Sequence, residues 1–300
     1  MKVEDCIIAN QVMPNARYGG LWESIVAEQG LKDRFLYQAV LDLTLRQRLS
    51  FQVTALHGLL LLYGPPGTGK TTLGRGLAQE LSGLLKPGAV RLIEVNPHGL
   101  MSSEHGQSQR AVRELLVEHV PLLAEDGKPT VLLLDEVESM AVSRGAASLT
   151  ANPVDVHRAT DAVLTALDEI ADQHSHIITV ATSNFTQVLD AAFISRADCA
   201  IELPLPDAGA IHTILRRVLA DFSGVYPSLA KLIDAAELRC VAESLVGCDG
   251  RRVRKVVTEA MAIRRDTALD PSALTAADLI AAARIASKKR RSEECNGTGR

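Results

Sequence analysis

Short apolar runs alternate with segments of helical spacing through roughly the first two thirds of the chain. Each run is nearly continuous in Leu, Ile and Val, which is typical of strands buried on both faces of a parallel sheet. The segments between the runs repeat apolar residues every three or four positions, as amphipathic helices do. The expected strands are residues 58–63, 89–96, 130–136, 176–184 and 199–206. This order predicts an α/β fold in which helices flank a parallel sheet.

After residue 206 the pattern becomes helical throughout, and four amphipathic segments follow one another without a strand-like run. The last of them begins near Thr275, with Asp278 three residues later, a pairing typical of a helix N-terminus. The chain is therefore expected to divide into an irregular N-terminal segment, a large α/β domain that opens with mostly helical residues 21–50, a small all-helical domain and a disordered tail. The predicted boundaries are 1–20, 21–206, 207–287 and 288–300.

Composition narrows the class of protein. The formal net charge of −4 and the aromatic content of 3% argue against a general nucleic-acid binder, which needs basic surface and stacking platforms. The five cysteines are scattered without a C-x-x-C pair, so a disulfide framework or zinc site is not expected. There is no secretion signal and no apolar run of membrane-spanning length. These features together predict a cytoplasmic protein.

The stretch LLLLYGPPGTGKTTLGRGLAQEL carries the strongest chemical signal. It fits G-x-x-x-x-G-K-[ST], a loop whose bare backbone N–H groups surround phosphates while its lysine reaches the β- and γ-phosphates. An ordinary glycine–proline turn is the alternative, but the strand before the loop and the amphipathic helix after it favour the phosphate site. The predicted nucleotide-binding residues are Gly64, Pro65, Pro66, Gly67, Thr68, Gly69, Lys70, Thr71 and Thr72.

Two acids follow the third apolar run, at the strand end where α/β sheets bind their ligands. Asp135 and the Thr71 hydroxyl are the expected Mg²⁺ ligands, Asp135 through water. Glu136 is the expected base that polarises the water attacking the γ-phosphate. Two acids that cap the next helix are the alternative, which explains either acid alone but not both in a P-loop protein.

Three further polar residues complete the predicted site. Asn184 ends the fourth run, where its amide could orient water, although it could also be an ordinary turn residue. Arg196 stands as an isolated cation before the last strand, where a neighbouring subunit could meet it. Arg251 or Arg252, at the start of a helix in the second domain, could reach the phosphates.

This set of residues resembles an AAA+ ATPase with its AAA+ core and small helical lid. The segments GLWESIV, GPPGTGKT, LIEVNPHGL, LLDEVESM, DAVLTALDEI, TSNFTQVLDAAFISRAD and GRRVRK resemble the pachytene-checkpoint AAA+ ATPases, which remodel HORMA-domain proteins. The resemblance covers residues from about 20 to at least 255. It implies that Asn184 is the first sensor, Arg196 the arginine finger and Arg251 the lid sensor.

Two features depart from the family pattern. Only about twenty residues precede GLWESIV, so the substrate-recruiting domain of the eukaryotic members is expected to be missing or minimal. The short form is similar to bacterial members of antiphage operons, where a HORMA protein controls a nucleotide-second-messenger synthase, that is, a nucleotidyltransferase. The expected pore loop, LMSSEHGQSQ, offers Met101, Glu104 and His105 where the family typically has an aromatic residue.

The resemblance thus implies a homohexamer that hydrolyses ATP with Mg²⁺ and pulls on the C-terminal segment of a HORMA partner. Ile25 and Val26 are the candidate adenine contacts. The first alternative is a DNA-directed AAA+ loader or initiator, which would need a basic pore or a DNA-binding domain. A non-catalytic nucleotide-switched scaffold would not need Glu136 or Arg196, and a small-molecule kinase would not need a trans arginine. No membrane partner is expected.

Overall fold

The computed structural model describes residues 3–85, 88–100, 107–141, 153–184 and 186–297. These residues form two compact units. The first unit holds residues up to Gly64 and from Lys70 to Leu203, whereas Pro65–Gly69 groups with the second unit, which continues from Pro204. Within the described residues, no helix combines the length and the apolar character needed to cross a bilayer.

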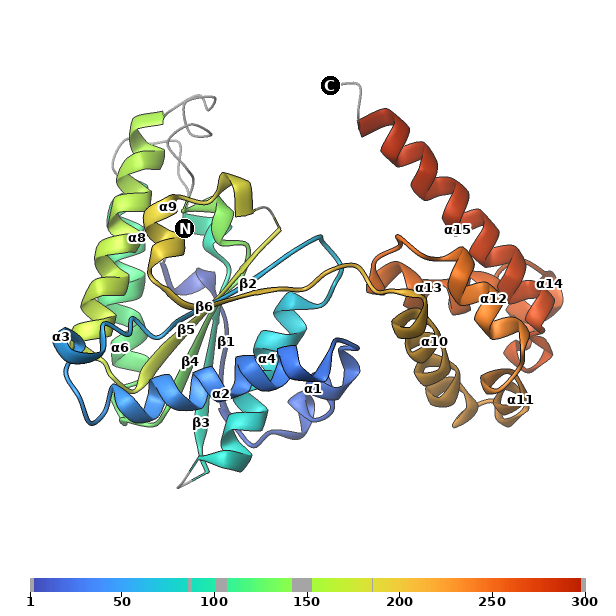
Figure 1. The fold of residues 1–300 in the computed structure, drawn as a ribbon, viewed down its shortest axis with the longest axis horizontal. Helices are drawn as coiled ribbons and strands as arrows, with labels where there is room; N and C mark the ends of the chain where they lie inside the picture. The colour runs from blue at the N-terminus through green and yellow to red at the C-terminus, as the bar shows by residue number, and fades with distance from the viewer. Residues whose placement is uncertain (1–2, 86–87, 101–106, 142–152, 185, 298–300) are drawn as a thin grey trace. The chain divides into compact units, whose positions relative to one another are not determined.

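The first unit contains a six-stranded sheet (Figure 1). Its strands are β1 (Ile7–Met13), β2 (Leu59–Tyr63), β3 (Val90–Val95), β4 (Thr130–Leu134), β5 (Ile177–Ser183) and β6 (Ala197–Glu202). Their spatial order is β1-β3-β4-β5-β2-β6, and β2 to β6 run parallel. Residues of β2, β4 and β5 are almost all fully buried, as near-continuous apolar strands require. The predicted sheet is therefore confirmed for these five strands.

The sixth strand is a correction to the sequence reading. Residues 1–20 were expected to be irregular, yet Ile7–Met13 forms β1 and pairs antiparallel with β3. Exposure alternates along β1, because one face of the strand packs against the rest of the first unit while the other face meets solvent. The run IIANQVM is short and interrupted by Asn10 and Gln11, so its strand character depends on the partner β3 rather than on its own composition.

Helices cover both faces of the sheet. One face carries α1 (Leu21–Ser24), α2 (Gln29–Leu45) and α4 (Lys70–Leu84) around Trp22, Phe35 and Leu77. The other carries α5 (Gln107–Arg113), the π-helix η4 (Glu114–His119), α6 (Val120–Leu123) and α8 (Pro153–Gln173). The π-helical turn precedes Pro121, which has no N–H to donate to the helical ladder. Two short helices, α3 (Phe51–Thr54) and α9 (Ala191–Ser195), lie before β2 and β6 in the chain.

The second unit is all-helical over its main segment. It contains α10 (Ala208–Ser223), α11 (Ala230–Ile233), α12 (Glu237–Ser244), α13 (Gly250–Met261), α14 (Arg265–Leu269) and α15 (Ala276–Gly297). The expected cap is present, since the Asp278 N–H donates to Thr275 Oγ1 at 3.4 Å and the Thr275 N–H donates back to Asp278 Oδ2 at 3.0 Å. The Arg264 guanidinium donates two hydrogen bonds to the Asp278 carboxylate. These bonds are the main reason that the pKa of Asp278 is lowered to about 2.

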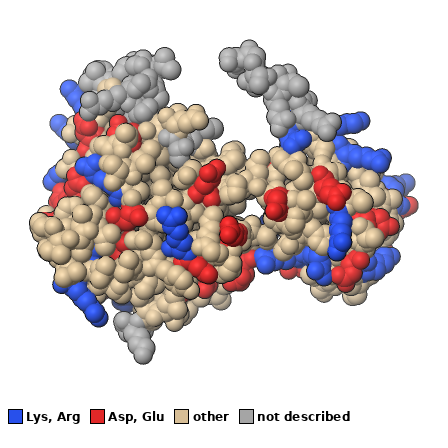
Figure 2. Space-filling model, in the orientation of Figure 1, with Lys and Arg blue, Asp and Glu red and all other residues tan. Residues whose placement is uncertain are grey.

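The expected disordered tail is also corrected. Residues 288–297 continue α15 as helix, because Lys, Arg and Glu are good helix formers and extend a helix already nucleated by packing. On the face drawn in Figure 2, acidic and basic side chains are interspersed on both units. Over the described residues of that face, charge is mixed rather than of one sign, which agrees with the net charge of −4.

A charged cluster lies buried where α2 approaches the sheet. The Arg46 guanidinium donates to the carbonyls of Ile177 at 2.6 Å and Ile170 at 3.2 Å. Asp42 is fully buried and accepts from the Gln38 amide at 2.8 Å. Burial, reinforced by the nearby charge of Asp198, raises the pKa of Asp42 from 3.8 to about 7. A protonated Asp42 is thus the form that the folded chain favours below neutrality.

We expect Asp42→Asn to raise the free energy of unfolding by an amount that grows with pH between about 4 and about 7. In this window the folded chain holds a proton on Asp42 that the unfolded chain has released, so wild-type stability falls as pH rises. The substituted amide is neutral throughout and keeps the oxygen that Gln38 uses. Urea unfolding across this window measures the difference, with Asp33→Asn on the same helix as control. A difference that does not vary with pH would contradict the assignment.

Candidate functional site

The phosphate loop follows β2 directly. Gly64 has φ +136°, and a Cβ there would lie 2.3 Å from the Leu203 carbonyl oxygen, so only glycine fits. Gly67 and Gly69 also have positive φ values, of 79° and 100°. The Lys70 side chain is buried and its ammonium donates to the Gly64 carbonyl at 2.8 Å. The sequence predicted a loop lined by backbone atoms and closed by a lysine. The positive φ values of these glycines and the Lys70–Gly64 hydrogen bond are the physical basis of that conformation.

Asp135 joins the helix after this loop to two strands. Its Oδ1 atom accepts hydrogen bonds from the Thr71 hydroxyl at 2.7 Å and from the Thr182 hydroxyl at 2.5 Å. Thr71 lies in the first turn of α4, Asp135 follows β4, and Thr182 lies on β5, the strand between β4 and β2. The structure therefore brings together the two residues predicted as Mg²⁺ ligands, and Thr182 donates to the same carboxylate oxygen.

Glu136 occupies a left-handed turn, with φ 55° and ψ 55°. A non-glycine residue pays for this conformation with strain of about 1–3 kcal/mol, and such residues concentrate at functional sites. Its backbone N–H donates to Thr182 Oγ1 at 3.0 Å, which helps to hold the turn. The Glu136 side chain is exposed, so water can reach its carboxylate.

Asn184 follows β5 and lies beside Glu136. Its amide Nδ2 donates to Glu136 Oε1 at 3.3 Å. Its backbone N–H donates to Glu138 Oε1 at 3.1 Å, so the start of the segment after β5 is fastened to the turn after β4. Glu136, Glu138 and Asn184 thus form one hydrogen-bonded group at the carboxyl ends of two neighbouring strands.

Arg196 is not the isolated cation that its sequence position suggested. It ends α9, and its guanidinium donates from Nε to Asp168 Oδ1 at 2.7 Å and from Nη2 to Asp168 Oδ2 at 2.8 Å. Asp168 comes from α8, 28 residues earlier, so the pair could not be read from the local sequence. Hydrogen bonding from Arg196 lowers the pKa of Asp168, which keeps that carboxylate charged.

The segment proposed to hold adenine is fixed by a buried lysine. Lys32 is 4% exposed; its ammonium donates to the Trp22 carbonyl at 2.9 Å and lies 5.1 Å from the Trp22 ring centroid. Ile25 and Val26 follow α1 and are half-buried, and Ile25 packs against the core that contains Trp22. Their contact with adenine stays a prediction.

The other predicted site residues are placed as follows. Thr72 is half-buried in the first turn of α4, next to Thr71. Arg251 is exposed at the start of α13, whose N-cap residue Asp249 accepts from the Arg252 N–H at 3.0 Å. Within the second unit, the Arg251 N–H donates to the Gly67 carbonyl at 3.2 Å. The predicted pore-loop residues Met101, Glu104 and His105 lie outside the described residues.

Sequence reasoning missed three residues that pair with the predicted ones. Thr182 is 1% exposed, and a hydroxyl at a buried strand position is a signal that could have marked it. Glu138 lies within the segment LLDEVESM, but nothing in its local sequence distinguishes it as a site residue. Asp168 could be found only from the tertiary pairing of α8 with α9.

The donor set fits a magnesium-bound nucleotide. The Thr71 hydroxyl and the Asp135 carboxylate are hard oxygen ligands, which Mg²⁺ prefers, and the positive-φ glycines of the loop leave its backbone N–H groups without covering side chains. Mg²⁺ bound with a nucleoside triphosphate supplies charge neutralisation between the β- and γ-phosphates. The chain's own contribution is to hold these two oxygens against each other before any ligand arrives.

Comparison with known proteins gives the family. The model of the "ATPase family associated with various cellular activities (AAA)" matches residues 60–205. The chain is 45% identical over 278 residues to "CD-NTase-associated protein 6" of Pseudomonas aeruginosa, covering 93% of this chain and 91% of that protein. It is 34% identical to the "Pachytene checkpoint protein 2 homolog" of Arabidopsis thaliana, over 80% of this chain and 49% of that protein.

The chain belongs to the AAA ATPases of the pachytene-checkpoint type. The resemblance seen in the sequence motifs is thereby confirmed, in the short form similar to a bacterial protein. Two solved structures share the fold of this AAA ATPase. The structure of C. elegans PCH-2 has a TM-score of 0.72 at 24% identity, over 94% of this chain and 75% of that one. A structure of the E. coli MS115-1 HORMA:CdnC:Trip13 complex has a TM-score of 0.74 at 15% identity, over 94% and 96%.

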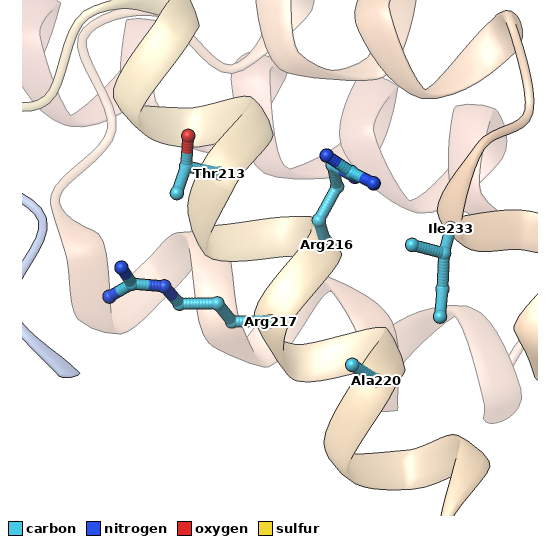
Figure 3. Close-up of a pocket in the computed structure, with 5 residues that line it drawn as sticks. All are labelled: Thr213, Arg216, Arg217, Ala220 and Ile233. Carbon is cyan, nitrogen blue, oxygen red and sulfur yellow. The ribbon is translucent and has the colours of Figure 1, made fainter. Parts of the chain in front are cut away.

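Family membership makes this AAA ATPase a nucleotide-binding protein. A separate hollow lies along α10, lined by Thr213, Arg216, Arg217, Ala220 and Ile233 (Figure 3). The Arg216 guanidinium there donates to Asp234 at 2.7 Å. These lining residues include none of those predicted to bind nucleotide, so the hollow has no part in the site described above.

We expect Lys70→Ala to weaken nucleotide binding by this AAA ATPase. The substitution removes the cation that the loop holds beside Gly64, whereas the glycine backbone that surrounds phosphate remains. A ligand at 100 times its dissociation constant stabilises a protein by about 2.7 kcal/mol, so ATP should raise the wild-type melting temperature. Lys70→Ala should lose most of this rise, and Lys128→Ala, remote in sequence on a loop before β4, should keep it. An unchanged rise in Lys70→Ala would contradict the assignment.

Proposed function

We propose that this AAA ATPase is an ATP-driven hexameric remodeller of a HORMA-domain partner in a bacterial antiphage signalling complex. The observation that carries the proposal is the length of the similarity to CD-NTase-associated protein 6, which extends over 93% of this chain rather than the AAA core alone. A solved structure that shares the fold of this chain is a complex of HORMA, CdnC and Trip13 proteins. These relations support a HORMA protein as substrate and, through it, association with a nucleotidyltransferase in the cytoplasm.

Hydrolysis would use the group at the ends of β4 and β5. Glu136 accepts a proton from the attacking water, a step for which its exposed carboxylate is suited. Asn184 orients that water through its amide, which already lies within hydrogen-bond distance of Glu136. Thr71 and Asp135 hold Mg²⁺, and Lys70 draws the γ-phosphate charge toward the loop. Each residue acts from an element whose position is set by the sheet.

Remodelling would need subunits that act together. Arg196 supplies positive charge to the ATP of the next subunit, and Arg251 reports the nucleotide state to the helical unit. Met101, Glu104 and His105 grip the C-terminal segment of the HORMA partner in the pore. A DNA-directed function would instead need a basic surface, and the mixed charge over the described face in Figure 2 gives it no support.

We expect Glu136→Gln to bind ATP with wild-type affinity while turnover falls by roughly 10²–10⁴, the usual size of a general-base effect. The amide keeps the size of the side chain and leaves Asp135 and Lys70 in place. Turnover and ATP affinity should be measured in parallel, with exposed Glu125→Gln as control. In the presence of ATP, Glu136→Gln should also retain a HORMA-domain protein encoded beside it. Wild-type turnover by Glu136→Gln would overturn the proposed chemistry.

Mixing two inactive variants tests Arg196 and the oligomer together. Lys70→Ala has a dead pocket and an intact arginine, whereas Arg196→Ala has an intact pocket and lacks the arginine. A trans arginine is worth roughly 10³–10⁵ in rate, so Arg196→Ala alone should hardly turn over. Mixed rings place an intact pocket against an intact arginine, and part of the ATPase activity should return. If native mass spectrometry shows mixed rings and no activity returns, Arg196 does not act across an interface.

A further inference from the structure

The Asp168 carboxylate contacts one side of the Arg196 guanidinium, the side that carries Nε and Nη2. The carboxylate accepts from Nε and Nη2, and Nη1 donates to the Ala192 carbonyl at 2.9 Å. A guanidinium carries five N–H donors, so these contacts use three. Within the described residues, one N–H on Nη1 and one on Nη2 have no hydrogen-bond partner. The arginine is therefore fixed in direction while two donors stay available.

The surroundings of this pair fix the backbone on both sides of Arg196. Before it, Asp190 caps α9 by accepting from the Ala192 N–H at 2.8 Å. After it, Asp198 accepts from three consecutive backbone N–H groups, those of His57 at 3.2 Å, Gly58 at 2.6 Å and Leu59 at 3.2 Å. The segment around Arg196 is thus held against the start of β2 and cannot turn freely.

His57 links the two carboxylates. Its backbone N–H reaches Asp198, while its ring nitrogen Nε2 lies 3.4 Å from Asp168 Oδ1. Asp168 therefore has two contacts, one with Arg196 and one with a ring held by the anchored backbone. A carboxylate so placed restrains the guanidinium relative to the sheet rather than only relative to α8.

We propose that Asp168 is a positioning residue that aims Arg196 at the nucleotide of the neighbouring subunit. This inference rests on the proposed trans role of Arg196. An arginine ordered before the subunits meet loses less conformational freedom when it engages the phosphate. A bidentate pair whose side chains are 22% and 44% exposed also contributes to fold stability, and thermal unfolding measures that contribution separately from kcat.

Asp168→Asn tests the proposal, because the amide keeps the shape but has one acceptor oxygen and no charge. We expect kcat for ATP hydrolysis to fall by roughly 10–100-fold, the scale of a misplaced catalytic group, with KM for ATP unchanged. Asp168→Glu keeps the charge and should retain an intermediate kcat. Asp172→Asn, exposed one turn further along α8, is the matched control and should match wild type. Thermal unfolding of every variant shows whether it folds.

Mixed rings separate positioning from other roles. Asp168→Asn mixed with Lys70→Ala should regain activity, since an intact arginine then meets an intact pocket. Mixed with Arg196→Ala it should regain none, because neither variant has a working arginine. Recovery with Arg196→Ala would overturn the proposal by placing the defect in Asp168's own pocket. If the Asn variant unfolds, Asp168→Glu takes its place, and its activity should rise more when it is mixed with Lys70→Ala than when it is mixed with Arg196→Ala.

Two further results would overturn the inference. A rise in kcat for Asp168→Asn would mean that Asp168 sequesters Arg196 instead of aiming it. A wild-type kcat for Asp168→Asn, when Arg196→Ala is inactive, would remove Asp168 from the mechanism and leave the proposed function intact. Wild-type turnover by Arg196→Ala would remove both, so the two failures are distinguishable.

Discussion

The rest of the site depends on the Asp135 carboxylate and the two threonine hydroxyls that donate to it. The Thr71 hydrogen bond holds the first turn of α4 against the end of β4. The Thr182 hydrogen bond holds β5 at the same place. One oxygen atom therefore sets the spacing between the phosphate loop, the acidic strand end and the strand that leads to Asn184. Charge-assisted hydrogen bonds of this length are among the stronger ones in proteins, which suits an atom that must keep its place before a ligand arrives.

Thr182 extends this constraint to the chemistry. Its oxygen also accepts the backbone N–H of Glu136, which keeps Glu136 in the left-handed turn and its carboxylate beside the Asn184 amide. The strain of that turn is offset by packing of the parallel sheet on both sides, where β4 and β5 are almost wholly buried. A rigid core thus supports a small group of exposed polar side chains at its edge, a common arrangement for binding and catalytic sites in α/β proteins.

The parts that sequence could predict are those encoded locally. The loop motif specifies its own conformation through glycine, and continuous apolar runs specify buried parallel strands. Strand β1 was missed because its sequence alternates weakly and needs β3 as a partner. The helical continuation of α15 was missed because polar composition was taken for disorder. The Arg196–Asp168 pair and the role of Thr182 join residues 28 and 47 positions from their partners, and no local pattern signals such contacts.

Hydrogen–deuterium exchange of the HORMA partner during ATP turnover tests the central claim most directly. The partner is incubated with this AAA ATPase and ATP, and exchange in its C-terminal segment is compared with that in the presence of ADP. The account predicts faster exchange in that segment only while ATP is hydrolysed. Steady ATP hydrolysis in a complex with the partner, with exchange in that segment identical to the ADP sample, would contradict it.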